Sequence, residues 1–135
     1  MIKTISFLFL LIPSTSLFLF NKIQEDDLPQ SIKRGESVYQ ANCASCHMPE
    51  GEGVQAVFPP LAKTDYVKNA KRAIGIILNG QEGEISVNGI TYNSAMTALP
   101  QLSDQEVADV LNFVRNSWGN KYPVIKAAEV KAERK

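Results

Sequence analysis

The chain has 135 residues, of which 44% are hydrophobic and 21% are charged; this composition is too apolar for a disordered chain and too polar for a bundle of membrane helices. Lysine and arginine together number 14, as do aspartate and glutamate, so no basic excess points to nucleic-acid binding. Two cysteines and one histidine exclude sites built from paired histidines or from four cysteines. We expect one domain of about 100 residues, since chains of this size rarely divide their core.

Residues 1–20 have the pattern of an export signal. A lysine at position 3 precedes a short apolar run, which Pro13 and hydroxyl residues interrupt before a second apolar stretch at 17–20. A positive start, a short apolar core and small residues are typical of a secretory signal. The alternative is an uncleaved anchor, although a helix over residues 5–20 would reach only roughly 24 Å of a hydrocarbon core of about 30 Å. Pro13 argues against a third interpretation, a buried helix of the domain.

We therefore expect an exported, periplasmic protein that contacts a membrane only through residues 1–20, and only if that segment stays attached. Residues 21–30 then form a polar linker and residues 31–119 form the domain. Residues 120–135 have little apolar content, so we expect a basic, solvated C-terminal tail with some frayed helix.

Two helices are predicted in the first half of the domain. The first covers about residues 31–42 and contains Gly35, which costs up to about 1 kcal/mol relative to alanine inside a helix. Close approach of another helix would explain this glycine, and simple tolerance would explain it nearly as well. The second helix covers about residues 65–79 and ends at Asn79-Gly80. Its apolar residues recur on one face: Val67, Ala70, Ile74, Ile77 and Leu78.

A short β-hairpin follows the second helix. Residues 85–87 and 90–92 each alternate apolar and polar side chains, and Asn88-Gly89 separates them. This dipeptide favours the type I′ turn of a two-residue hairpin. The sequence therefore predicts two antiparallel strands at this point.

The final helix has the clearest signals. Ser103 and Glu106 have the spacing of a capping box, and Leu102 and Val107 that of a hydrophobic staple. An apolar stripe at helical spacing follows until Gly119 ends the helix: Val107, Val110, Leu111, Val114 and Trp118.

Residues Cys43–His47 carry the pattern C-x-x-C-H, the attachment signature of a c-type haem. Two thiols at this spacing can reach the two vinyl edges of one porphyrin and form thioethers, and the next residue projects its imidazole at the iron. A disulfide between Cys43 and Cys46 is an alternative, although so short a loop closes little chain entropy. A thioredoxin-like motif would need a βαβ setting that the predicted elements lack, and zinc would need more ligands. We expect one covalently bound haem c.

If haem is bound, its iron needs a second axial ligand from elsewhere in the chain. His47 is the only histidine, which excludes ligation by two histidines. Met1 lies in the signal, and Met48 adjoins the first ligand and cannot reach the opposite face of the haem. Met96 remains, 49 residues after His47, between the hairpin and the final helix. A methionine usually fills a core, but elimination favours Met96 as an iron ligand together with His47.

Together these residues resemble the class I (mitochondrial-type) monohaem cytochromes c, over about residues 32–119. The resemblance implies an all-α, class I cytochrome c fold, with about three main helices around one haem and a short β-hairpin before the segment of the axial methionine. It also implies that the first and last helices cross, with Gly35 and Tyr39 against Val110 and Phe113. The motifs that carry it are Gly35-x-x-x-Tyr39, Cys43-x-x-Cys46-His47, Phe58-Pro-Pro-Leu61, Met96 and the final helix through Phe113.

Further roles follow from the resemblance. The carbonyl of Pro59 would accept a hydrogen bond from the imidazole of His47 and fix its ring, and Leu61 would line the haem pocket. Segments near the hairpin and in the final helix are similar to a bacterial subset found as cytochrome subunits, or fused domains, of periplasmic dehydrogenases and copper nitrite reductases. In that subset a proline often follows the ligand methionine directly, whereas Thr97 does so here.

We predict an electron carrier rather than an enzyme. Histidine and methionine fill both axial positions of the iron, so no position is open to substrate, and the sequence shows no paired carboxylates or nucleophile with its base. The expected partners are redox proteins, such as a dehydrogenase, reductase or oxidase, and no nucleic acid. One alternative is a haem-based gas sensor with a labile methionine ligand. Another is a permanent electron-transfer subunit of a larger oxidoreductase, for which Val54, Val57 and Phe58 are candidate contacts.

Charge is unevenly distributed along the chain. Residues 25–118 hold 12 acidic and 7 basic side chains, whereas residues 119–135 hold 2 acidic and 5 basic ones. A solvated acidic surface is the simple interpretation, and a docking field for a basic redox partner is the sharper hypothesis. Four glutamates lie in the predicted loops: Glu50, Glu52, Glu82 and Glu84.

Overall fold

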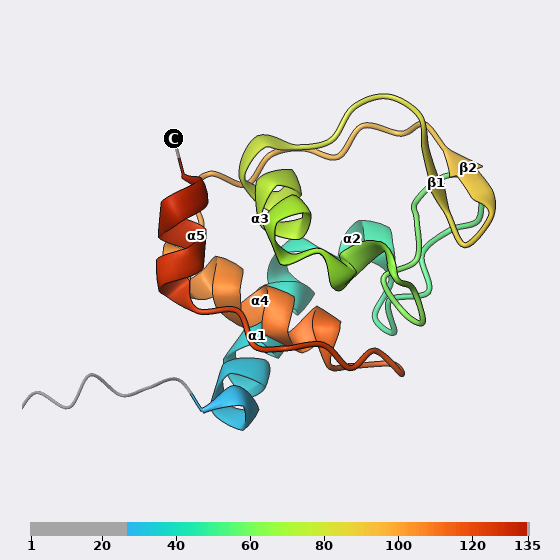
Figure 1. The fold of residues 1–135 in the computed structure, drawn as a ribbon. Helices are drawn as coiled ribbons and strands as arrows, with labels where there is room; N and C mark the ends of the chain where they lie inside the picture. Colours follow the sequence, from blue (N-terminus) through green and yellow to red (C-terminus); the bar gives the residue numbers. More distant parts are fainter. Residues whose placement is uncertain (1–26, 135) are drawn as a thin grey trace, which may run out of the picture.

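Residues 27–134 are described by the computed structural model, and the predicted export signal at residues 1–20 lies outside them. The predicted all-α fold with a small hairpin is confirmed, and no helix of this part is both long and apolar enough to cross a membrane. Figure 1 shows the elements in this part of the chain: α1 (Leu28–Asn42), α2 (Ala44–His47), the 3₁₀ turn η1 (Tyr66–Lys68), α3 (Ala70–Asn79), the antiparallel strands β1 (Ile85–Val87) and β2 (Ile90–Tyr92), α4 (Asp104–Arg115) and α5 (Ala127–Glu133).

Helices α1 and α4 pack directly on each other, and Gly35 permits their close contact. A Cβ atom on Gly35 would lie 1.9 Å from the carbonyl oxygen of Asp109 and 2.9 Å from the Cβ atom of Phe113. Any side chain would therefore push the helices apart. One turn later, the rings of Tyr39 and Phe113 lie 5.3 Å apart between centroids, and Val110 is buried in the same core. Close approach, rather than simple tolerance, explains the glycine.

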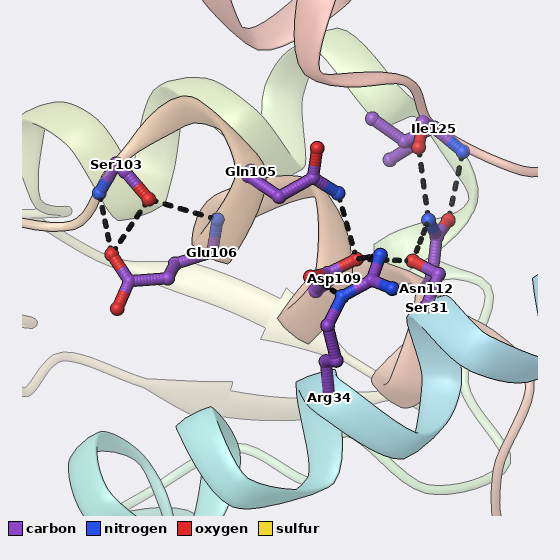
Figure 2. Close-up of polar contacts among 8 residues, drawn as sticks. All are labelled: Ser31, Arg34, Ser103, Gln105, Glu106, Asp109, Asn112 and Ile125. Carbon is purple, nitrogen blue, oxygen red and sulfur yellow. Dashed lines mark hydrogen bonds and ion pairs between the residues drawn. The ribbon is translucent and has the colours of Figure 1, made fainter. Parts of the chain in front are cut away.

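A buried polar cluster joins α1, α4 and the C-terminal segment (Figure 2). Asp109 is 2% exposed. Its carboxylate pairs with Arg34 Nε at 2.7 Å and Nη2 at 2.8 Å, and accepts a hydrogen bond from Ser31 Oγ at 2.5 Å. Asn112, in the next turn, donates to Ser31 Oγ and to the Ile125 carbonyl, and its own oxygen accepts from the Ile125 N–H at 2.7 Å. These partners offset the cost of burying the polar side chains.

Helix α1 begins three residues earlier than predicted. It starts at Leu28 with Pro29 in its first turn, where the missing N–H of proline costs no hydrogen bond. The predicted linker over residues 21–30 therefore ends in helix. A proline after acidic residues is as compatible with a linker as with a helix start. The predicted boundary at residue 31 is therefore wrong by three residues.

The second predicted helix is divided. The sequence predicts one helix over residues 65–79, but η1 ends at Lys68 and α3 begins at Ala70. Asn69 explains the break, because its side chain accepts a hydrogen bond from the Arg72 N–H at 3.0 Å and its backbone is extended, as a helix N-cap requires. The predicted apolar face does pack on the core, where four of its residues are buried: Val67, Ile74, Ile77 and Leu78.

The predicted hairpin is confirmed. Val87 pairs with Ile90 in an antiparallel register. Asn88 and Gly89 have φ angles of 51° and 78°, the left-handed values that a type I′ turn requires. The hairpin lies between α3 and the segment that carries Met96.

Helix α4 starts as predicted and ends early. The Glu106 N–H donates to Ser103 Oγ at 3.2 Å and the Ser103 N–H donates to the Glu106 carboxylate at 2.8 Å (Figure 2), which confirms the capping box. The helix ends at Arg115, although the apolar stripe predicts its continuation to Trp118. The φ angles of Trp118 and Gly119 are 52° and 94°, so the chain turns back there. An apolar residue stands at position 118 because it packs against aromatic rings of the core. The Trp118 ring lies 5.1 Å from that of Tyr39, between centroids.

The C-terminal segment is packed, and the expected solvated tail is wrong. Figure 1 shows α5, in red, beside the orange α4. Ile125 and Val130 are 1% and 0% exposed and belong to the main core. Among residues 121–134 only Ile125 and Val130 are buried, and two positions are too few to form a periodic pattern among the charged residues around them.

Candidate functional site

The two cysteines and the histidine lie where α1 passes into α2. The Cys43 N–H still donates to the Tyr39 carbonyl of α1 at 2.8 Å, and the His47 N–H donates to the Cys43 carbonyl at 2.9 Å. Cys43 and Cys46 form no disulfide with each other; Cys46 is exposed, and burial raises the pKa of the Cys43 thiol to about 11. One helical turn thus presents two thiols and one imidazole to the same cavity.

The imidazole of His47 is held by a backbone carbonyl. Its Nδ1 atom lies 2.9 Å from the carbonyl oxygen of Pro59, and a carbonyl can only accept, so Nδ1 must carry the hydrogen. The Nε2 atom then keeps its lone pair for a ligand bond. His47 is buried, and burial lowers its pKa in spite of the hydrogen bond to Pro59. Burial therefore favours the neutral ring, which is the form that binds metal ions.

The loop of residues 48–61, here called the proximal loop, fixes the position of that carbonyl. A Cβ atom on Gly53 would lie 2.3 Å from the Phe58 carbonyl oxygen and 2.8 Å from the Pro59 carbonyl oxygen. The Gly53 N–H also donates to the His47 carbonyl at 3.0 Å. At the start of the loop, the hydroxyl of Tyr39 donates to the Met48 carbonyl at 2.6 Å. Backbone contact on both sides thus leaves the Pro59 carbonyl little freedom.

Residues beyond α4 hold the end of the proximal loop. Asn120 Nδ2 donates to the Leu61 carbonyl at 2.7 Å and to the Val114 carbonyl at 2.8 Å, and its oxygen accepts from the Thr64 N–H at 3.3 Å. The Trp118 ring covers the same loop, since a Cβ atom on Gly51 would lie 2.5 Å from it. No sequence signal marks Asn120 as a functional residue, because an asparagine after glycine is also typical of an ordinary helix end.

Met96 lies in the segment between β2 and α4. Its N–H donates to the Gln81 carbonyl at 2.8 Å, and its carbonyl accepts from the Gln81 N–H at 3.0 Å. Gly80 allows this contact, because a Cβ atom there would lie 2.6 Å from the Met96 carbonyl oxygen. Met96 is half-buried and packs against the core. Met48 does not line the cavity that Met96 and His47 share.

One cavity of about 330 Å³ brings the predicted residues together, a volume within the range of cofactor pockets. Its wall is mostly apolar, so it suits a flat hydrophobic macrocycle. The two thiols, the imidazole and the thioether are groups that can attach haem c and bind its iron. The residues present therefore fit that group. All six predicted site residues line it: Cys43, Cys46, His47, Pro59, Leu61 and Met96.

Comparisons with known proteins agree with this geometry. Residues 32–118 match the family model described as cytochrome c. Cytochrome c-552 of Thermus thermophilus is 40% identical over 91 residues, which are 64% of this chain and 69% of the relative. The cytochrome c subunit of a quinone alcohol dehydrogenase from Gluconacetobacter polyoxogenes is 38% identical over 103 residues, which are 71% of this chain and 21% of the subunit. The cbb3-type cytochrome c oxidase subunit FixP of Sinorhizobium medicae is 26% identical over 106 residues, which are 78% of this chain and 34% of that subunit.

Proposed function

The chain belongs to the cytochrome c family and its cofactor is haem c, and on this premise we propose that it carries single electrons between redox proteins, with His47 and Met96 as the axial ligands of the iron. The observation that supports the proposal is the shared cavity, in which two thiols, one imidazole and one thioether line a mostly apolar wall. When bound, the haem supplies an iron that alternates between ferrous and ferric states by one electron.

Each residue has a separate task in this proposal. Cys43 and Cys46 would hold the group covalently through thioethers, and His47 Nε2 would bind the iron on one side. Pro59 would keep the imidazole ring oriented through its carbonyl. The Met96 sulfur would bind on the other side, and the apolar side chains around Leu61 would exclude water, which limits the reorganisation that electron transfer requires.

Absorption spectra of the full-length exported holoprotein test this proposal. The oxidised protein is expected to be low-spin with a methionine–iron charge-transfer band, and CO should leave the reduced spectrum unchanged. The variant Met96→Ala should lose the band, and Met48→Ala should keep it. If the wild-type protein is high-spin or binds CO readily, the proposed electron carrier is wrong and the haem-based gas sensor is favoured.

A permanent subunit of a larger oxidoreductase is a second candidate. Val54 and Val57 are 37% and 42% exposed, and they lie in the proximal loop beside the residues that line the cavity. The similar dehydrogenase and oxidase subunits are much longer than the matched segment, so their assembly is a proposal for this chain. Size-exclusion chromatography of the protein from its native host discriminates the two, since a carrier elutes as a monomer and a subunit elutes with its complex.

We further propose a basic docking face on the partner. Two of the exposed glutamates lie in the proximal loop, and two follow Gln81, which lines the cavity. Such charges can steer a basic protein toward the cavity and accelerate encounter. Residues 1–20 support a periplasmic location for both proteins. The glutamates are Glu50, Glu52, Glu82 and Glu84.

A further inference from the structure

The end of α5 contacts the segment that joins Met96 to α4. Arg134 Nη2 donates to the Leu102 carbonyl at 2.7 Å, and Nη1 donates to the Pro100 carbonyl at 3.1 Å. Its Nε pairs with the Asp104 carboxylate, in the first turn of α4, at 2.8 Å. One guanidinium thus bridges two carbonyls of this segment and the helix that follows it. Figure 1 shows the C-terminal end of α5 next to the orange chain that enters α4.

The same segment, residues 97–103, is fastened differently at its beginning. Met96 exchanges two backbone hydrogen bonds with Gln81, and the Leu99 N–H donates to the Ile77 carbonyl at 2.8 Å. These contacts hold the first half of the segment to the end of α3. Arg134 holds the second half. The segment is therefore anchored at both ends, from two elements that are far apart in the sequence.

Arg134 is itself carried on a firmly packed element. Val130, one turn earlier in α5, is fully buried in the core. Glu133 pairs with Lys71 of α3 at 3.4 Å, and the chain before α5 is pinned by Asn112 through two hydrogen bonds to Ile125. A guanidinium on such a base loses little further freedom when it forms its three contacts, because its planar fork is already oriented.

We propose that Arg134 is a positioning residue for the axial methionine. By holding residues 97–103 closed, it keeps the Met96 thioether at the cavity and slows the exchange of that sulfur for an external ligand. Thr97, which follows Met96, is exposed, so the contacts described above are what restricts the motion of the segment. This inference rests on the proposed assignment of Met96 as an iron ligand.

The rate at which imidazole binds to the ferric full-length holoprotein tests the proposal, because imidazole can bind only when the methionine has left the iron. Arg134→Ala should raise this rate by roughly threefold to tenfold, since charge-assisted hydrogen bonds are lost. Arg134→Lys should restore little, because the compact ammonium of lysine has three donors but lacks the planar fork that spans these separated acceptors. Lys131→Ala, an exposed position on the same helix, is the matched control and should leave the rate unchanged.

Unfolding midpoints of all variants, measured in parallel, separate positioning from general support. If Arg134→Ala lowers the midpoint but leaves the imidazole rate within error of wild type, or if Lys131→Ala raises the rate equally, the inference is wrong. Met96→Ala tests the assignment beneath it. If that variant keeps the charge-transfer band and the wild-type rate, Met96 is not the ligand, and both the proposed ligation and the role of Arg134 are overturned.

Discussion

The backbone of Gly53 lies against the Pro59 carbonyl that accepts the hydrogen bond from His47, and a methyl group at Gly53 would come within 2.8 Å of that oxygen. Gly53→Ala should therefore displace the carbonyl and weaken the bond to Nδ1. A less basic imidazole stabilises ferric iron less, so the reduction potential should rise by an amount on the order of tens of millivolts. A spectroelectrochemical titration measures the change.

Gly83→Ala is the control for that experiment. Gly83 has a φ of +83° and no neighbouring atoms within 4 Å, whereas Gly53 has a φ of +65° and several. Both variants should lose roughly 1–2 kcal/mol of stability through backbone strain. Only Gly53→Ala should change the potential, and equal potentials in the two variants would argue against carbonyl displacement.

Asn120→Ala should destabilise the folded protein by about 2–3 kcal/mol. The side chain is buried, and its removal leaves the Leu61 and Val114 carbonyls and the Thr64 N–H without these hydrogen bonds. Asn116→Ala is the comparison, since its side chain forms one hydrogen bond, to the Asn112 carbonyl, and should cost about 1 kcal/mol. Urea unfolding measures both, and similar losses would show that Asn120 does not fasten the proximal loop.

Tyr39→Phe should make stability less sensitive to alkaline pH. Burial raises the pKa of the Tyr39 phenol well above its ordinary value, with smaller effects from nearby acidic groups. Above about pH 10 an unfolded tyrosine ionises while the folded one stays protonated, so the folded state loses up to about 1.4 kcal/mol per pH unit. Below that pH the group contributes no such dependence.

Unfolding free energies of wild type and Tyr39→Phe, measured from pH 8 to about 11, reveal this difference. At the lower pH the variant should be less stable by about 1 kcal/mol, because the hydrogen bond to the Met48 carbonyl is lost. The difference in unfolding free energy between the two proteins should become smaller as the pH rises. Tyr66→Phe, in η1, serves as the reference substitution, and a constant difference would contradict the prediction.

Val130→Asp should destabilise the protein by at least about 3 kcal/mol, because it places an unpaired charge in the core. Val130 is 0% exposed, whereas Ala128 in the same helix is exposed. Ala128→Asp should cost less than about 0.5 kcal/mol. Thermal unfolding of the two variants compares the buried and exposed faces of α5. Equal losses of stability would indicate that both faces of the helix are solvated.

Electron transfer to a basic partner should slow as ionic strength rises, because salt screens the steering charges. A double variant, Glu50→Gln with Glu52→Gln, should lower the second-order rate by roughly twofold to tenfold at low salt. Glu36→Gln, an exposed position on α1, should not. Stopped-flow rates with a basic redox protein test this prediction. Rates that do not depend on salt would contradict a role of these glutamates in docking.

The sequence predicted those parts of the molecule that local chemistry determines. The capping box at Ser103 and the turn at Asn88-Gly89 each satisfy their own backbone geometry, so their positions were predicted correctly. Helix boundaries were less predictable. Pro29 and Asn69 are local helix-start signals that a linker or a helix interior also accommodates, whereas tertiary contacts decide the end of α4 and the packing of the C-terminal segment. Trp118 follows the helical stripe but packs on aromatic rings after the helix has ended. Ile125 is buried in the main core, and its backbone bonds to the side chain of Asn112 in α4.

The candidate site divides in the same way. The C-x-x-C-H pattern places Cys43, Cys46 and His47 within one turn, and its chemistry is evident from the residue types alone. The supports around them come from long-range contacts of common residues: the backbone of Gly53, the amide of Asn120 and the guanidinium of Arg134. No local pattern distinguishes these residues from ordinary loop, cap or tail positions, so only the folded arrangement identified them.

The chain after α4 fastens both sides of the cavity, through Asn120 on the proximal loop and through Arg134 on the segment after Met96. A native-state fluctuation that releases residues 120–134 would therefore loosen both walls together. Such a unit is expected to behave as one foldon in amide hydrogen exchange, with the two walls sharing a single opening free energy. The cavity would then open as a whole or remain closed, although its two walls lie far apart along the chain.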